Sequence, residues 1–256
     1  MKSAARPLPE VTFSDQGDIR FLHFGTPWVQ GSMRMDEPFG IHLEYVQRMM
    51  AWLLFVPPVS VAKRHAMQLG LGAAALTKFS HRKLRMRTTA IELNAQVIAA
   101  CRLWFKLPAD DQRLTVVLGD AAEVARHEHW RASVDALQVD LYDEEAAAPV
   151  LDSESFYRDC RRLLTEDGCM MVNLFGRDAS YERSLARIVA AFGEEAVWAF
   201  RPTREGNTVV AALRSPCEPT RAQLAERAET IETRWGLPAR KWLRVFRPLA
   251  RATPTR

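Results

Sequence analysis

The stretch AMQLGLGAAALTKF, residues 66–79, decides the fold of this chain. A short apolar run ends in Gly70-x-Gly72, and a helix-forming segment follows at once. Glycines let the backbone turn tightly and approach a ligand closely, and the start of a helix offers free N–H groups. A second apolar run ends in Glu92, where a carboxylate can accept hydrogen bonds from the hydroxyls of a ribose. A tight structural turn alone would explain the glycines, but with the acid at this distance the pattern predicts a nucleoside-binding site.

Two classes of cofactor share this pattern, the nicotinamide or flavin dinucleotides and S-adenosylmethionine (SAM) with its relatives. The next two predicted strands separate the classes. The third ends in Gly119-Asp120-Ala121, and the fourth ends in Asp140 with Asp143 just beyond. A polar residue after the third strand that can read an adenine amino group, followed by acids after the fourth, is typical of SAM-type folds. The sequence therefore favours a SAM-type domain over a dinucleotide-binding one.

From residue 64 onward, predicted strands and helices alternate along the chain. Strands are predicted near 65–69, 87–92, 113–118, 134–140 and 168–174, and helices near 73–82, 94–105, 121–130, 153–165 and 179–192. The segments VWAFRP and NTVVAALR are predicted to close the sheet as an antiparallel pair. This order predicts an α/β, Rossmann-like fold with a mainly parallel seven-stranded sheet, helices on both faces, and ligands at the carboxyl ends of the strands.

Smaller regions are predicted on either side of this domain. We expect residues 1–39 to form a small β-hairpin region, residues 40–213 the SAM-type α/β domain, and residues 214–256 a basic helical tail. The run IHLEYVQRMMAWLLF, residues 41–55, has apolar residues at helical spacing and predicts one helix with a buried face. In the tail, Thr220 and Gln223 predict a capping box, and Gly236 ends the helix.

Composition narrows the function classes. The 256 residues, 48% of them hydrophobic, suit one α/β domain with small additions. The net charge of +4 arises in the tail, where residues 214–256 carry +6 against −2 for the rest. A nucleic-acid binder would usually cluster basic residues with aromatic ones, so packing or a dimer contact is favoured for the tail. Four cysteines without C-x-x-C spacing indicate neither zinc nor disulfides. The absence of a leader and of a long apolar segment indicates the cytoplasm.

The order of the motifs resembles that of the polyamine aminopropyltransferases, the spermidine synthase family. That family has a glutamine in an N-terminal β region, a Tyr-His-Glu-like motif, a glycine-rich turn, acids after the second, third and fourth strands, and a helix opened by a Phe-Tyr pair. The chain carries, in the same order, WVQGSM, HLEYV, LGLGAAA, AIELN, LGDAAE, VDLYDEE and SESFYRDCRRLLTEDG. The resemblance covers about residues 11–213.

The resemblance implies a function and a set of donor contacts. The implied reaction moves an aminopropyl group from decarboxylated SAM to a putrescine-like amine. SAM itself stays open as the alternative donor. Glu92 would hold the ribose of the donor, and Asp120 with Ala121 would read its adenine. The implied donor-binding residues are Gln30, Gly70, Gly72, Glu92, Asp120 and Ala121. We expect a small-molecule amine as partner and a homodimer, without metal, nucleic acid or membrane.

The resemblance also implies an acid at the reaction centre. Asp140 would be the catalytic carboxylate, because a carboxylate beside the attacking amine can take its proton and hold it in line. Asp143 would help to bind the amine, together with His42 and Glu44 from the second motif. Carboxylates suit a substrate that arrives as a polycation. For Asp143, a solvated acidic loop is an equally good interpretation.

Several positions depart from the family pattern. The acid of the glycine-rich turn, which holds the aminopropyl ammonium of the donor in that family, falls on Ala73. Its Tyr-His pair falls on His42 and Leu43, and a proline after the second aspartate falls on Glu144. Two alternatives therefore stay open. One is a SAM-dependent methyltransferase, because without an acid at Ala73 a donor that keeps its carboxylate is repelled less. The other is a catalytically inactive nucleoside-binding homologue.

Overall fold

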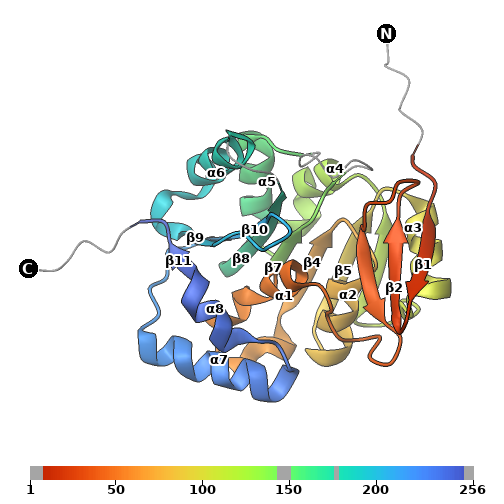
Figure 1. The fold of residues 1–256 in the computed structure, drawn as a ribbon. Coiled ribbons are helices and arrows are strands. Elements are labelled where there is room, and N and C mark those ends of the chain that lie inside the picture. The colour runs from red at the N-terminus through yellow and green to blue at the C-terminus, as the bar shows by residue number, and fades with distance from the viewer. Residues whose placement is uncertain (1–7, 143–150, 176–178, 251–256) are drawn as a thin grey trace, which may run out of the picture.

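Two sheets make up the part of the chain that the structure describes. The computed structural model describes residues 8–142, 151–175 and 179–250. Within these residues a three-stranded antiparallel sheet stands beside an eight-stranded sheet (Figure 1). The small sheet consists, in this order, of β1 (Thr12–Gln16), β2 (Ile19–His23) and β3 (Gly31–Arg34). It confirms the β region expected ahead of the main sheet.

The large sheet confirms the predicted α/β class. Its strand order is β11-β9-β10-β8-β7-β4-β5-β6. Five neighbouring strands run parallel, namely β4 (His65–Leu69), β5 (Arg87–Glu92), β6 (Leu114–Leu118), β7 (Val134–Val139) and β8 (Leu164–Phe175). Antiparallel pairing adds β9 (Val197–Phe200), β10 (Asn207–Leu213) and β11 (Phe246–Pro248). Strands β4 and β10 are buried at every position, as strands covered on both faces must be.

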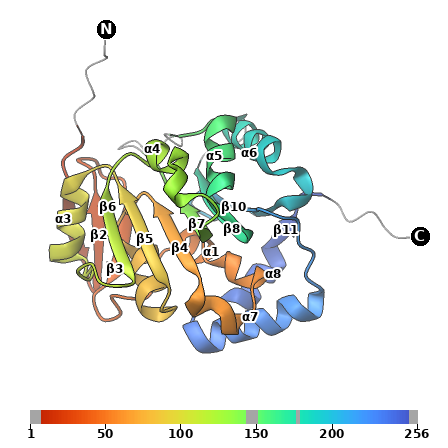
Figure 2. The same ribbon diagram turned by 180° about the vertical axis from the view of Figure 1, so that it is seen from behind.

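Helices cover both faces of the large sheet. They are α1 (Glu44–Arg48), α2 (Ala75–Lys78), α3 (Ala95–Trp104), α4 (Ala121–Arg126), α5 (Glu154–Leu163), α6 (Ala179–Phe192), α7 (Arg221–Trp235) and α8 (Ala239–Val245). Helices α4, α5 and α6 lie together on one side, whereas α7 and α8 lie on the other (Figures 1 and 2). None of the helices in the described ranges is long and apolar enough to cross a membrane.

The carboxyl ends of the central strands are joined by main-chain hydrogen bonds. The N–H of Gly70 donates to the carbonyl of Ile91 at 2.9 Å, and that of Asp140 donates to Leu69 at 3.0 Å. The N–H of Gly119 donates to Glu92 at 2.9 Å. The residues that follow β4, β5, β6 and β7 are thereby held at one edge of the sheet, which is where a SAM-type fold places its ligand.

Two sequence expectations need correction. The sheet has eight strands rather than seven in the described part, because β11 pairs with β9 beyond the predicted closing pair. Residues 41–55 do not form one helix: α1 is followed by a separate 3₁₀ turn, Ala51–Phe55, whose five residues are all buried. An α-helix with one buried face would turn some of this run to solvent, and the apolar side chains pack inward instead.

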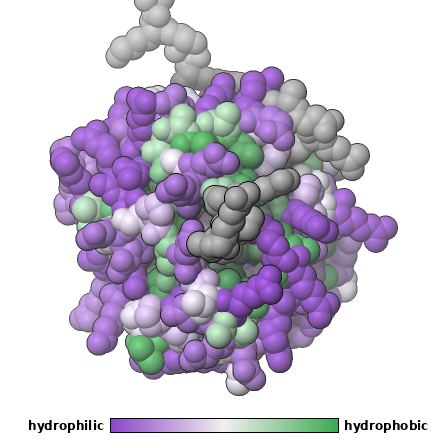
Figure 3. Space-filling view, turned by 90° about the vertical axis from the view of Figure 1, so that its left-hand side faces the viewer, coloured by the Kyte–Doolittle hydropathy of each residue, from purple (hydrophilic) through white to green (hydrophobic). Residues whose placement is uncertain are grey.

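The tail does more than form one helix. The capping box predicted at Thr220 and Gln223 is present, and Gly236 ends α7 with a positive φ of 72°. A second helix, α8, then leads into β11, whose Phe246 ring stacks on that of Phe200 at a centroid distance of 4.3 Å. The side of the molecule that carries the C-terminal elements is mainly hydrophilic, with small hydrophobic areas (Figure 3). The tail therefore packs through its apolar side chains and turns its charges outward.

Candidate active site

A cavity of about 1140 Å³ opens at the carboxyl ends of the strands. This volume is large enough for a nucleoside together with a small amine. Its wall contains nine of the ten site residues expected from the sequence, namely Gln30, His42, Glu44, Gly70, Gly72, Glu92, Asp120, Ala121 and Asp140. The tenth, Asp143, lies outside the described residues, as does Glu144. Chain segments far apart in the sequence thus meet around one space.

The glycine-rich turn is shaped by close contact with two other segments. Gly70 has a φ of +86°, and a Cβ at this position would lie 2.2 Å from the carbonyl oxygen of Asp140. Gly72 has a φ of +51°, and a Cβ there would lie 3.1 Å from the carbonyl oxygen of Gln30. Only glycine combines a positive φ with so little room. The turn is therefore fixed against the strand that ends in Asp140 and against the N-terminal sheet.

Glu92 is held by main-chain donors on both of its oxygens. Its side chain is only 9% exposed. Oε2 accepts the N–H of Leu71 at 2.9 Å, and Oε1 accepts the N–H of Asn94 at 2.8 Å. Burial raises the pKa of the Glu92 carboxyl, and these hydrogen bonds oppose that shift. Each carboxylate oxygen keeps a second acceptor position, so Glu92 can still bind hydroxyl groups.

Asp120 begins a helix at the wall of the cavity. Its Oδ1 accepts the N–H of Ala122 at 2.7 Å and so caps α4, while Ala121 next to it is buried. The apolar side chain of Leu93, which is 54% exposed, also lines this end of the cavity. This end of the cavity therefore combines an apolar surface with a polar group at the start of a helix.

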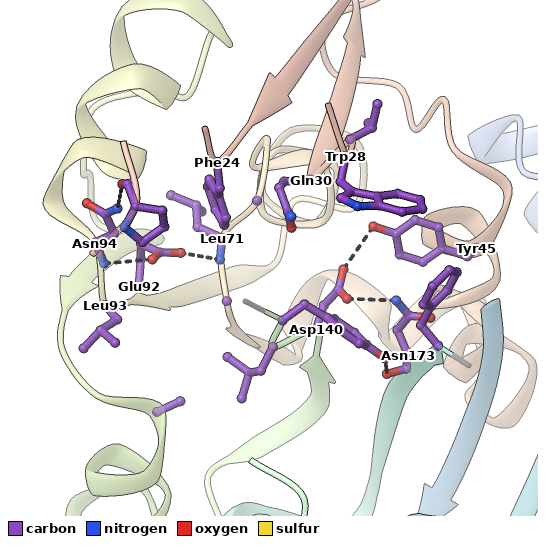
Figure 4. A pocket seen from close by; sticks show the side chains of 18 of the residues that line it. Phe24, Trp28, Gln30, Tyr45, Leu71, Glu92, Leu93, Asn94, Asp140 and Asn173 are labelled. Atoms are coloured by element: carbon purple, nitrogen blue, oxygen red, sulfur yellow. Dashed lines mark hydrogen bonds between the residues drawn. The ribbon is translucent and has the colours of Figure 1, made fainter. Parts of the chain in front are cut away.

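Asp140 lies at the other end of the cavity, held by side chains from two separate elements. Its Oδ2 accepts the hydroxyl of Tyr45 at 3.3 Å, and its Oδ1 accepts the amide Nδ2 of Asn173 at 3.0 Å. Burial raises the pKa of the Asp140 carboxyl to about 6, although both hydrogen bonds act to lower it. Figure 4 shows Asp140 and Glu92 on opposite sides of Gln30 and Leu71. Around pH 6, Asp140 can therefore both accept and release a proton, and above that pH it is mainly ionised.

The sequence did not single out Tyr45 or Asn173. Tyr45 follows Glu44 in the HLEYV motif, where the resemblance drew attention to the residues before it. Asn173 could have been found from register, because β7 and β8 are parallel with Val139 opposite Val172, so the residues after them are neighbours. Asn173 is also a polar residue inside the apolar run MMVNLF.

His42 and Glu44 line the cavity but are engaged with other residues. The His42 Nδ1 lies 3.0 Å from the hydroxyl of Ser32. Glu44 forms an ion pair with Arg48 at 2.5 Å, and its side chain is 55% exposed. Arg48 also donates to the carbonyl of Arg201 at 2.6 Å. Their expected role in binding an amine stays a prediction.

Ala73 lies outside the wall of the large cavity. It is 2% exposed and lies against Gly31, where an added Cβ would be 2.7 Å from its own. It borders a smaller space of about 20 Å³, shared with Gln30, Tyr45 and Asp140. That volume suffices for about one water molecule. A carboxylate at Ala73 would therefore be enclosed beside Asp140.

The described part of the cavity wall is rich in carboxyl groups. The described residues that line it include five acids and neither lysine nor arginine. The acids are Glu44, Glu92, Asp120, Asp140 and Glu205. A cleft lined by one sign of charge concentrates ligands of the opposite sign. The described residues contain no group of three or more His, Cys, Asp or Glu side chains arranged to hold a metal ion.

Comparison with known proteins identifies the family. The family model of the spermine/spermidine synthase domain matches residues 70–202. The chain is 34% identical over 245 residues to the polyamine aminopropyltransferase of Neisseria meningitidis serogroup A, and the match covers 95% of this chain and 91% of that protein. The chain belongs to the spermine/spermidine synthase family and is a transferase of the polyamine aminopropyltransferase type, which confirms the resemblance found in the motifs.

Solved structures share the fold. A probable spermidine synthase from Corynebacterium glutamicum has a TM-score of 0.73 at 18% identity, and the match covers 96% of this chain and 94% of that one. Human methyltransferase-like protein 13 in complex with SAH has a TM-score of 0.68 at 21% identity, and the match covers 76% and 93%. At these identities the likeness concerns the fold alone, which is the SAM-type fold predicted from the strand order.

Proposed function

We propose that this chain transfers the aminopropyl group of decarboxylated SAM to a primary amine of a small diamine such as putrescine. The observation that carries the proposal is the Asp140 carboxyl, which lies at the tip of β7 in a cavity whose described charges are all negative. Family membership supports the type of transfer. The donor form, the acceptor and the residue roles are the content of the proposal.

The donor nucleoside is proposed to bind at the Glu92 end. The second lone pairs of the Glu92 oxygens would accept the two ribose hydroxyls without disturbing the main-chain donors already bound. Asp120 and Ala121 would border the adenine. Gly70 and Gly72 would bring the main chain of the turn to the donor, because both line the cavity. Gln30 lies between this end and Asp140 (Figure 4).

The choice of donor follows from charge. Decarboxylated SAM carries a sulfonium and an ammonium, and both are cations. SAM also carries a carboxylate, for which the described cavity wall offers no lysine or arginine. Placing that carboxylate among fixed acids would cost several kcal/mol. The acids at hand therefore favour the decarboxylated donor even though Ala73 supplies none.

The chemistry requires a neutral amine and an acceptor for one proton. The amine nitrogen would attack the propyl carbon next to the sulfonium. The new C–N bond forms as the C–S bond breaks, and the electron pair of that bond goes to sulfur, leaving neutral methylthioadenosine. The attacking nitrogen loses one proton, which Asp140 would accept. Tyr45 and Asn173 hold the carboxylate in place for this step.

The proposal is tested by supplying both substrates. Purified protein is incubated with putrescine and either decarboxylated SAM or SAM, and methylthioadenosine and the aminopropylated amine are quantified by mass spectrometry. We expect equal amounts of both products from decarboxylated SAM, and at least about 100-fold less from SAM because of the repelled carboxylate. Amine-independent release, or methyl transfer from SAM, would refute the proposal.

Four broader expectations belong to the same proposal. A homodimer should give twice the chain mass of 29.1 kDa in light scattering. A reaction that uses no metal should keep its rate after dialysis against a chelator. A cytoplasmic location is tested by fractionating cells that produce the protein. Mixing the purified protein with nucleic acid or with lipid vesicles should give no complex.

A further inference from the structure

Two buried asparagines connect Asp140 to the antiparallel part of the sheet. Asn173 of β8 donates its Nδ2 to the Asp140 Oδ1 at 3.0 Å. The Asn173 Oδ1 in turn accepts Nδ2 of Asn207 of β10 at 3.1 Å. Asn173 is 3% exposed and Asn207 is 9% exposed. Figure 4 shows Asn173 directed at Asp140, and all three residues line the cavity.

The chain of hydrogen bonds has a fixed direction. An ionised carboxylate can only accept hydrogen bonds, whereas each asparagine side chain has one donating and one accepting end. If Asn173 is to donate to Asp140, its oxygen must face a donor on the other side. Asn207 supplies that donor. The amide of Asn207 therefore determines which end of Asn173 faces the carboxylate.

The backbone keeps Asn207 in place. Its N–H donates to the hydroxyl of Thr203 at 3.2 Å, and its carbonyl accepts the N–H of Thr203 at 2.7 Å. In the β8–β10 ladder Asn207 stands opposite Phe175, two residues beyond Asn173, which makes the two asparagines diagonal neighbours on one face. The carbonyl of Asn173 also accepts the Tyr142 hydroxyl at 2.9 Å. The main chain at both asparagines is therefore held in place.

We propose that Asn207 is a positioning residue for Asp140: through Asn173 it fixes the direction of the hydrogen bond that keeps the carboxylate oriented and ionised. The proposal rests on the proposed function, in which Asp140 accepts a proton from the amine. With Asn207 in place, the Asn173 amide offers N–H to Asp140. If Asn207 were an acceptor instead, Asn173 would offer its oxygen, and Asp140 would need a proton to form the bond.

Among the residues that the structure describes, few other titratable groups lie near Asp140. Tyr45 from α1 and Tyr142 from the segment after β7 both have a pKa raised by burial and by the charge of Asp140, so both remain neutral. Arg48 of α1 is engaged with Glu44. The remaining charged or titratable residues of the described cavity wall are His42, Glu44, Glu92, Asp120 and Glu205. Asn173 is the neighbour that donates a hydrogen bond to Asp140 and whose own side-chain amide is oriented by a third residue, Asn207.

The test compares two substitutions at one position. In a pH profile of kcat/KM for the amine, the acid limb is the pH below which the profile steepens because Asp140 becomes protonated. Asn207→Asp places an acceptor where the donor was, and we expect the acid limb to rise by about one to two pH units. Asn207→Leu has a similar branched shape but neither donor nor charge, and we expect a rise of about half a unit to one unit.

A matched control lies next to it in the sequence. Thr208 is also buried on β10, but side chains alternate along a strand, so it points to the opposite face of the sheet. We expect Thr208→Val to leave the acid limb in place. A purely structural role for Asn207 would lower the melting temperature without moving the acid limb. If Asn207→Asp does not fold, Asn207→Leu decides, because an apolar side chain is tolerated in a buried strand.

The outcomes separate this inference from the proposed function. An acid limb that stays in place in the folded Asn207 variants overturns the inference, whereas an inactive wild-type protein overturns the proposed function. The inference about Asn207 can be tested even if the protein shows no catalytic turnover. Carbon-13 NMR of labelled aspartate, with the Asp140 signal assigned by its loss in Asp140→Asn, should show the Asp140 carboxyl titrating at a higher pH in both Asn207 variants than in the wild type.

Discussion

The two ends of the cavity each carry a buried carboxyl group, and they hold it in different ways. Glu92 accepts two main-chain N–H groups, from Leu71 and Asn94, both within the glycine-turn and strand motif. Asp140 accepts side-chain donors, Tyr45 and Asn173, which come from distant parts of the chain. The main-chain donors of Glu92 are fixed by the fold, so Glu92 is suited to binding a ligand. The side-chain donors of Asp140 can change position, so Asp140 is suited to gaining and losing a proton.

The largest effect should follow Asp140→Asn. The amide keeps the shape of the side chain but cannot take a proton, and a lost general base costs about 10²- to 10⁴-fold in rate. Turnover with decarboxylated SAM and putrescine should fall by that factor, while the dissociation constant of methylthioadenosine stays within about threefold. The melting temperature at pH 8 should not fall, because a buried charge has been removed. A variant that keeps most of its turnover would make Asp140 structural only.

Glu92→Ala should have the opposite profile. It removes the proposed acceptor for the ribose and leaves the N–H groups of Leu71 and Asn94 without their partner, at about 1–3 kcal/mol for each unsatisfied group. Methylthioadenosine should bind at least about tenfold more weakly, and the melting temperature should fall. Isothermal titration calorimetry on the folded variant measures the first effect, and differential scanning calorimetry measures the second. Unchanged affinity would remove Glu92 from the nucleoside site.

A smaller change is expected for Asp120→Ala. The variant loses the N-cap of α4, which is worth about 0.5–2 kcal/mol of stability. It also loses the polar group proposed to border the adenine, so methylthioadenosine should bind more weakly, although less so than after Glu92→Ala. Asp120→Asn keeps an N-cap and serves as the control for the helix. If the two substitutions weaken binding equally, the carboxylate itself contacts the ligand and the cap matters little.

The difference between the two ends also explains what the sequence could predict. The Glu92 end follows from spacing, because the turn, the acid and the helix that line it are close in the chain. The acid after β7 was found in the same way. Tyr45 and Asn173 were not found, because their role depends on how α1 and β8 are placed around Asp140, and no local pattern encodes that placement.

The same reasoning applies to the fold. The alternation of strands and helices predicted the central sheet, because the apolar residues of each element recur with the period of a strand or of a helix. The strand β11 was missed because three residues ending in Pro248 carry no periodic signal, and its pairing depends on the contact of Phe246 with Phe200. Ala73 shows the same limit: the motif places it in the glycine-rich turn, yet the packing of Gly31 encloses it.

The pH dependence of the wild-type reaction tests the role of Asp140 as proton acceptor most directly. With Asp140 titrating at a pKa of about 6, raised by burial, the carboxylate is present above that pH and is lost below it. The logarithm of kcat/KM for putrescine, plotted against pH from 5 to 8.5, should therefore steepen by about one unit of slope below pH 6. A slope that stays constant across this range would show that no group with this pKa takes part, and would contradict the assignment of Asp140 as the proton acceptor.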